Sequence, residues 1–115
     1  MILIVGGYAS GKREYVQEAL GFSPEQMANA VLNELPVVYN VQEMVESAPE
    51  NAMNLLEPLC KKAVVICNET GGGIVPMRMT ERAGREATGR LCVLLARRAE
   101  RVVRIVCGLP QILKP

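Results

Sequence analysis

The sequence of 115 residues contains no histidine and no tryptophan, and it has a single phenylalanine. Without histidine, the chain lacks the commonest general base and the commonest metal ligand, and a nucleotidyl-histidine intermediate is excluded. Aspartate is absent as well, so all twelve acidic residues are glutamate and any carboxylate chemistry is glutamate chemistry. Because aromatic residues make up only 3% of the chain, the core must consist of valine, leucine, isoleucine, methionine and alanine.

The charge balance and the cysteines narrow the class of protein. The formal net charge is +1, so no overall field marks a nucleic-acid or membrane binder. Residues 1–5 are apolar, but they have no charged start and are too few for a signal segment or a membrane span. The four cysteines form no C-x-x-C pair, which favours a reduced, cytoplasmic protein with cysteines as small core residues. They are Cys60, Cys67, Cys92 and Cys107.

Apolar runs alternate with helical patterns along the whole chain, which predicts one domain spanning residues 1–115. We expect strands at 2–5, 30–33, 63–67 and 102–108, and a short tail after them. Helices are expected at 11–20, 24–28, 40–62 in two pieces broken by Pro49 and Pro58, and 80–99 behind a Thr80 cap. The prediction is an α/β fold of three layers with a small, mainly parallel sheet of about four strands.

The first strand is followed by a glycine-rich segment that opens a helix. Residues 6–12 read Gly-Gly-Tyr-Ala-Ser-Gly-Lys and match the G-x4-G-K pattern of a phosphate-binding P-loop. In this context, backbone N–H groups and the helix N-terminus surround a phosphate, and Lys12 reaches the outer phosphates. The plainer interpretation is a glycine-rich turn with no ligand. The expected nucleotide-binding residues are Gly6, Gly7, Tyr8, Ala9, Ser10, Gly11, Lys12, Arg13 and Asn68.

Arg13 stands where the P-loop pattern has Ser or Thr, whose hydroxyl holds Mg²⁺. Its permanent positive charge cannot bind a metal ion. One interpretation is that Arg13 pairs directly with a phosphate, charge for charge. The other is that it repels the metal ion and leaves a loop that takes free nucleotide, sulfate or nothing.

Two apolar runs end in the same dipeptide, Asn33-Glu34 and Asn68-Glu69. In open α/β sheets, ligands lie beyond the carboxyl ends of the strands, where an acidic residue helps to hold Mg²⁺. We therefore expect Glu34 and Glu69 to be catalytic residues together with Lys12, and Glu34 to be a metal ligand. The alternative is that each glutamate is a solvated residue at the end of a strand.

Eight of the thirteen basic residues lie in 78–104, and Arg78, Arg82 and Arg85 share one helix face. One interpretation is a site for a phosphate-bearing ligand. The more common one is a solvated face paired with Glu81 and Glu86. Because no aromatic residues are interleaved, a nucleic-acid groove is not expected.

The second half of the chain carries longer motifs. These are "NETGGGIVP" at 68–76, "GR" at 89–90, "ARRAERVVRIVCGLP" at 96–110 and "LK" at 113–114. With "GGYASGKR" at 6–13 and "VLNEL" at 31–35, they resemble the bifunctional adenosylcobinamide kinase / adenosylcobinamide-phosphate guanylyltransferase family. That family has T-N-E-V-G-x-G-I-V-P, G-G-x-x-S-G-K-S and a strand ending L-L-E-C in the matching places.

The resemblance implies a P-loop α/β fold, assembly as a homotrimer and a role in cobalamin biosynthesis. Family members use GTP or ATP with Mg²⁺ to phosphorylate cobinamide, and then transfer GMP to that phosphate through a nucleotidyl-histidine. By match, Gly6, Gly11 and Lys12 would cradle phosphates, and Glu34 and Asn68-Glu69 would face the active site. This chain has no histidine, so guanylyl transfer by that route is closed, and Arg13 replaces the Mg²⁺-holding serine.

Three functions are compatible with the sequence. The first is a minimal cobinamide kinase that keeps phosphoryl transfer, which needs positioning and charge rather than a covalent intermediate. The second is a non-catalytic homologue that binds nucleotide or a corrinoid, or regulates a partner protein. The third is a relic that binds nothing and associates with itself. The kinase should bind nucleotide and turn it over, the binder should bind nucleotide or a corrinoid without turnover, and the relic should do neither.

Overall fold

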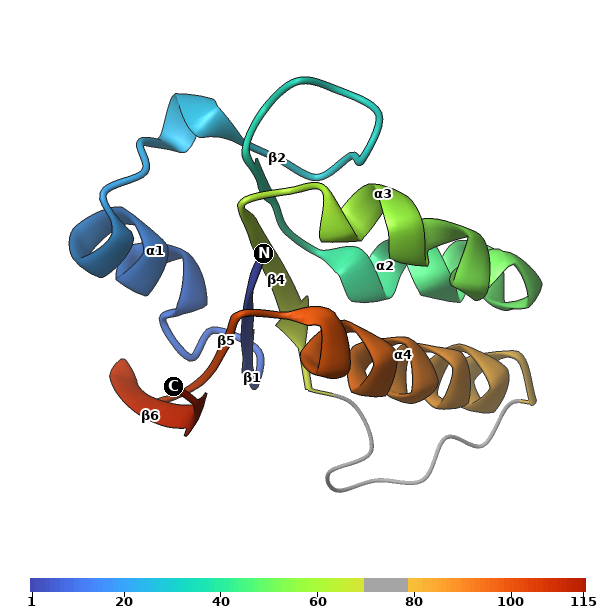
Figure 1. The fold of residues 1–115 in the computed structure, drawn as a ribbon. Coiled ribbons are helices and arrows are strands. Elements are labelled where there is room, and N and C mark those ends of the chain that lie inside the picture. The colour runs from blue at the N-terminus through green and yellow to red at the C-terminus, as the bar shows by residue number, and fades with distance from the viewer. Residues whose placement is uncertain (70–78) are drawn as a thin grey trace.

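The computed structural model describes residues 1–69 and 79–115, with the backbone alone for residues 79–81. Its helices and strands alternate along the described chain, as expected for an α/β protein (Figure 1). The elements are β1 (Ile2–Gly6), α1 (Lys12–Leu20), β2 (Met27–Ala28), β3 (Val37–Val38), α2 (Val41–Ser47), α3 (Leu56–Cys60), β4 (Val64–Asn68), α4 (Met79–Arg98), β5 (Arg101–Val106) and β6 (Leu109–Lys114).

The strands form one mixed sheet in the order β2-β3-β4-β1-β5-β6, parallel except for the β5–β6 pair. Helix α1 covers one face, and α2, α3 and α4 lie on the other (Figure 1). Successive side chains of β1 lie on opposite faces of the sheet. Leu3 belongs to the buried cluster that includes residues of α2 and α4, and Ile4 belongs to the cluster that includes Val16 of α1. Burial on both faces explains why the central strands are continuous apolar runs.

The predicted strand at 30–33 is wrong, and the sheet has six strands rather than about four. Residues 30–36 form a loop whose turn is set by Asn33, which donates to the Ala30 carbonyl and accepts from the Leu35 N–H. Lys62 adds bonds from its ammonium group to the Asn33 and Leu35 carbonyls. Such local side-chain bonds compete with strand pairing, so the strand forms later, as β3.

The C-terminal tail is also a strand. β6 pairs antiparallel with β5 through a two-residue turn, in which Cys107 and Gly108 have φ of 51° and 77°. Positive φ at both positions is what a tight hairpin turn of type I′ requires. The sequence prediction missed this turn because Cys-Gly is not a typical hairpin dipeptide.

The helices are close to those predicted, with local differences. The expected helix over 40–62 is divided into α2, a 3₁₀ helix at Pro49–Leu55 and α3. Pro49 begins the 3₁₀ helix, but Pro58 lies in the first turn of α3, where a missing N–H costs nothing. The predicted short helix at 24–28 is a 3₁₀ helix over Pro24–Gln26. Helix α4 begins at Met79, so Thr80 lies inside it rather than before it.

The cysteines are only partly core residues. Cys67 is buried, Cys60 and Cys92 are half-buried, and Cys107 is exposed. Along the described chain, no helix is both long enough and apolar enough to cross a membrane.

Candidate functional site

The loop of residues 6–12 joins the carboxyl end of β1 to α1 and is held tightly by the β5–β6 hairpin. A Cβ atom on Gly6 would lie 2.7 Å from the Ile105 carbonyl oxygen and 2.6 Å from the Ser10 hydroxyl oxygen. The Gly108 N–H donates to the Ser10 carbonyl at 2.8 Å. Gly11 takes a left-handed φ of 94°, which glycine adopts without strain. The sequence pattern and the neighbouring hairpin together fix the path of the loop.

Lys12 is the buried charge of this loop. It is the first residue of α1, only 7% exposed, and its ammonium group donates to the Gly7 carbonyl inside the curve of the loop. Burial lowers the pKa of Lys12, and the nearby Cys67, Glu69 and Glu14 oppose that shift. The protein therefore holds a desolvated cation at a helix N-terminus, an arrangement that favours an anion.

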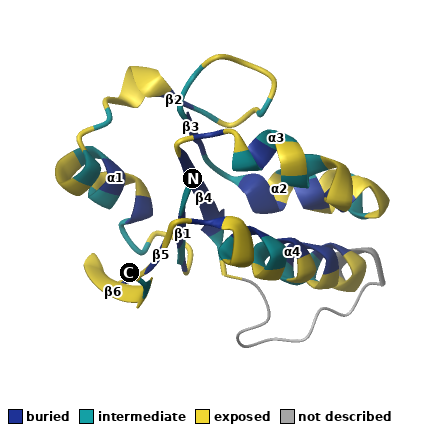
Figure 2. Cartoon of the chain, in the orientation of Figure 1, coloured by how far each residue is buried: buried dark blue, intermediate teal, exposed yellow. Residues whose placement is uncertain are grey.

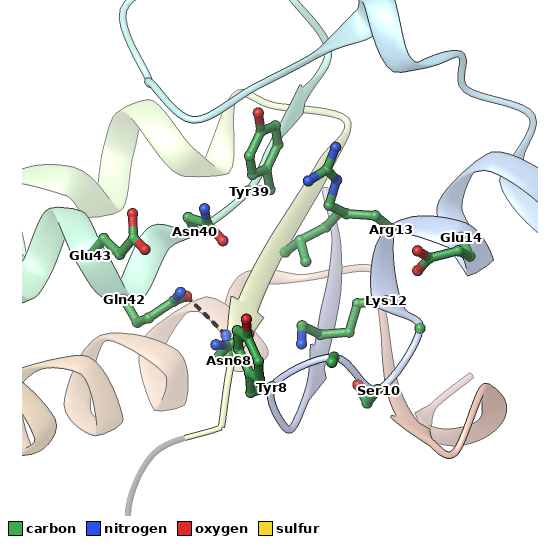
Figure 3. Close-up of a pocket in the computed structure, with 13 residues that line it drawn as sticks. Tyr8, Ser10, Lys12, Arg13, Glu14, Tyr39, Asn40, Gln42, Glu43 and Asn68 are labelled. Carbon is green, nitrogen blue, oxygen red and sulfur yellow. Dashed lines mark hydrogen bonds between the residues drawn. The ribbon is translucent and has the colours of Figure 1, made fainter.

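Arg13 lies on the other side of the helix start. Its guanidinium carbon is 4.4 Å from the centre of the Tyr39 ring, which is a cation–π contact. Figure 3 shows the Arg13 side chain directed toward Tyr39 at the end of β3, while Lys12 points into the loop. The two cations are thus held at separate places along the pocket.

A pocket of about 440 Å³ lies between the loop and the first turn of α2 (Figure 3). Its walls come from the loop, α1, the ends of β3 and β4, and α2. Residues 39–43 were not predicted to line a pocket, because the strand before them was expected at 30–33 and lies at Val37–Val38. The lining residues are Tyr8, Ala9, Ser10, Gly11, Lys12, Arg13, Glu14, Tyr39, Asn40, Gln42, Glu43, Ile66 and Asn68.

Asn68 lies where the sequence predicted it, at the carboxyl end of β4. It is paired in register with Gly6, its N–H donates to the Gln42 side-chain oxygen at 3.0 Å, and it lines the pocket. Glu69 is adjacent, with its N–H donating to the Gly6 carbonyl at 2.8 Å. Its carboxylate does not line the pocket but forms a two-point ion pair with Arg104 of β5. That ion pair raises the pKa of Arg104.

The prediction that Glu34 lies beyond the carboxyl end of a strand is wrong. The loop that carries it precedes β3, and the Pro36 carbonyl accepts from the Ala63 N–H at the amino end of β4. Glu34 is exposed and lines a different hollow with Lys61 and Lys62. Because the amino and carboxyl ends of parallel strands lie at opposite edges, the Asn-Glu repetition does not bring Glu34 to Glu69.

The described residues around the loop do not fit a Mg²⁺ ion. Arg13 occupies the position of the hydroxyl ligand, Tyr39 and Asn40 follow β3, and Glu69 is already paired with Arg104. Glu14 and Glu43 line the pocket from different helices. Within residues 1–69 and 82–115, no three acidic or cysteine side chains are grouped closely enough to hold a metal ion. We therefore assign no step to a divalent cation.

Arg82 and Arg85, the described residues of the arginine-rich face, do not line this pocket. Arg78 lies outside the described residues, Arg82 is exposed on α4, and Arg85 is half-buried. Arg98, at the end of α4, forms an ion pair with Glu57 of α3 instead, with its two N–H groups at 2.9 and 3.2 Å from the carboxylate oxygens.

These features define an α/β protein with a mainly parallel sheet and a pocket at the carboxyl edge of that sheet. Residues 25–113 match the sequence model of the cobinamide kinase / cobinamide phosphate guanyltransferase family, and the chain belongs to this family. The match confirms the resemblance drawn from the motifs. It contains the pocket residues from Tyr39 to Asn68, but it begins after the loop of residues 6–12. A search of curated proteins found no match.

Proposed function

We propose that the chain binds a nucleoside triphosphate, GTP or ATP, with its phosphates in the loop of residues 6–12. The observation that carries the proposal is Lys12, a nearly buried cation held inside a glycine-rich loop at the N-terminus of α1. The Ser10 hydroxyl, buried without a hydrogen-bond partner among the described residues, is a second group that a phosphate oxygen would satisfy. Membership of a family described as kinases and guanyltransferases of cobinamide supports the choice of ligand.

Within this proposal, Gly6, Gly7, Tyr8, Ala9 and Gly11 bring backbone groups to the phosphates. Lys12 and Arg13 supply charge, and Asn68 forms the wall at the end of β4. Glu69 supports the loop through its bond to the Gly6 carbonyl. We propose that guanylyl transfer is lost, because no histidine exists to carry the nucleotide.

Titration calorimetry with GTP and ATP tests this proposal directly. Replacing Lys12 with alanine is expected to weaken binding by about tenfold to a hundredfold, since a buried charge-assisted bond is worth about 1.5–3 kcal/mol. Lys61→Ala is the control, because Lys61 is exposed at the opposite edge of the sheet. Equal affinity in wild type and Lys12→Ala would contradict a role for the loop.

The second candidate is a non-catalytic member of the family that binds nucleotide or cobinamide, or regulates a partner, without turnover. The lack of a Mg²⁺ ligand at position 13 favours it over the minimal kinase. An assay of phosphate transfer from labelled GTP or ATP to cobinamide separates the two. Labelled cobinamide phosphate would establish the kinase, and binding without product would establish the binder.

We also propose that the chain forms homo-oligomers, with the family's trimer as the expected form. The edge strand β6 is exposed from Leu109 to Leu113 (Figure 2), and the large apolar side chains of this stretch are Leu109, Ile112 and Leu113. Apolar side chains gathered on one strand are typical of a contact surface. Gel filtration with light scattering should give about three times the monomer mass for wild type and a smaller mass for Ile112→Glu. A monomeric wild type at the concentrations used for binding would contradict the proposal.

A further inference from the structure

We infer that this pocket takes the phosphates of a free, metal-free nucleotide, with the guanidinium of Arg13, held by Tyr39, in place of a divalent cation. The inference rests on the nucleotide binding proposed above and adds to it the charge state of the ligand. The described residues of the pocket do not fit Mg²⁺, so another group must balance the charge of the phosphates. Among the described residues, Tyr39 and Asn40 directly follow β3, and Glu69, which directly follows β4, is paired with Arg104.

The first step concerns charge. A nucleoside triphosphate normally reaches a phosphate site with Mg²⁺ bridging its outer phosphates and neutralising part of its charge. Here Lys12 lies inside the loop and the Arg13 guanidinium lies over Tyr39, so two cations line the same pocket at separate places. A guanidinium is always charged, and its planar donors bind phosphate oxygens two at a time. The helix N-terminus adds to the same field.

The second step concerns position. A long arginine side chain loses rotamer freedom when it is fixed on a ligand. The Tyr39 ring, 4.4 Å from the Arg13 guanidinium carbon, keeps that group at the pocket before any ligand arrives. Tyr39 directly follows β3, at the edge of the sheet where a metal site would need a carboxylate. The aromatic residue and the arginine therefore form one unit, in which each replaces a group that a metal site requires.

The third step concerns the acidic residues that face the pocket. Glu14 follows Arg13 on α1 and Glu43 lies on α2, and both side chains are exposed. Figure 3 shows these two carboxylates at opposite sides of the pocket. In water, exposed charges act weakly on a ligand. Lys12 is buried, so its charge is screened less than the charges of these glutamates, and Arg13, although exposed, is held over the Tyr39 ring. A metal-bound nucleotide would bring an additional positive charge into the same pocket.

Calorimetry with GTP and ATP in excess EDTA and in excess Mg²⁺ tests the inference. Wild type is expected to bind in EDTA with an affinity equal to or higher than that in Mg²⁺. Arg13→Ser, which restores the hydroxyl, is expected to bind about tenfold more weakly in EDTA and to regain affinity when Mg²⁺ is added. Arg13→Lys keeps the charge and should still bind in EDTA. Arg97→Ser is the control, because Arg97 is exposed at the far end of α4.

Two substitutions of Tyr39 test whether its ring holds Arg13 in place. Tyr39→Phe keeps the ring and should therefore bind more tightly in EDTA than Tyr39→Leu, which removes it. Tyr39→Leu should lower the affinity for nucleotide in EDTA by about twofold to fivefold, which corresponds to the free energy of an exposed cation–π contact. Binding by the wild type only in the presence of Mg²⁺ would overturn the inference and leave the proposed function standing. Binding in neither condition would reject the proposed function, and the inference with it.

Discussion

Gly6→Ala is expected to destabilise the protein by about 1–3 kcal/mol, the usual cost of forcing an extra methyl group into a packed site. It should also remove nucleotide binding. The new Cβ would lie 2.7 Å from the Ile105 carbonyl oxygen, which is a backbone atom of the neighbouring strand and cannot rotate away. It would also lie 2.6 Å from the Ser10 hydroxyl. To relieve both contacts, the loop must move away from β5, which displaces Lys12.

The matched control for this substitution is the next residue. A Cβ on Gly7 would meet no atom within 4 Å, and Gly7 is not one of the glycines with positive φ. Gly7→Ala should therefore leave the free energy of unfolding nearly unchanged. Urea unfolding followed by circular dichroism, with calorimetry on the same samples, measures both effects. If Gly6→Ala and Gly7→Ala have the same free energy of unfolding, the loop does not pack closely against β5.

The central part of the fold could be predicted because burial on two faces leaves a strong pattern. β1, β4 and β5 are apolar strands at or near their predicted positions, and glycine-rich residues 6–12 follow β1 as expected. Helix α4 shows the expected spacing of buried residues, including Ala87, Leu91 and Leu95. Where one strand or helix contributes a whole buried face, the sequence alone is sufficient to identify it.

The short strands β2 and β3 could not be predicted, and β3 leads into one wall of the pocket. β2 and β3 are two residues long, too short to show any periodicity, and residues 30–33 are apolar enough to resemble a strand. The turn at Asn33 depends on Lys62, which is 29 residues away. Because the strand was misplaced, Tyr39 was not recognised as a pocket residue. The contact between Arg13 and Tyr39 joins two helix-and-strand units and leaves no local signal.

The different positions of Glu34 and Glu69 also depend on tertiary structure and leave no local signal in the sequence. Asn33-Glu34 and Asn68-Glu69 are identical in sequence, yet the first lies before a strand and the second after one. The partner that neutralises Glu69 is Arg104, which reaches it only because β5 lies next to β1 in the sheet. Strand order is a tertiary property, so the same dipeptide indicated the same role for two glutamates that the fold places at opposite edges of the sheet.

Leu91→Ala is expected to lower the free energy of unfolding by about 2–5 kcal/mol, the usual cost of a leucine-sized cavity in a packed core. Leu91 is completely buried on α4, in the cluster that contains Leu3 of β1 and Val45 of α2, so no neighbour is free to fill the space. Val93→Ala, two residues away on the exposed side of the same helix, is the control and should cost less than about 0.5 kcal/mol. Urea unfolding of the three proteins at one pH measures the difference. The cluster joins α4 to β1, and β1 leads into the loop. If Leu91→Ala lowers the free energy of unfolding by the expected value of about 2–5 kcal/mol in one cooperative transition, the nucleotide pocket and the helical layer unfold as a unit. If Leu91→Ala and Val93→Ala lower the free energy of unfolding by the same small amount, Leu91 of α4 does not pack against β1.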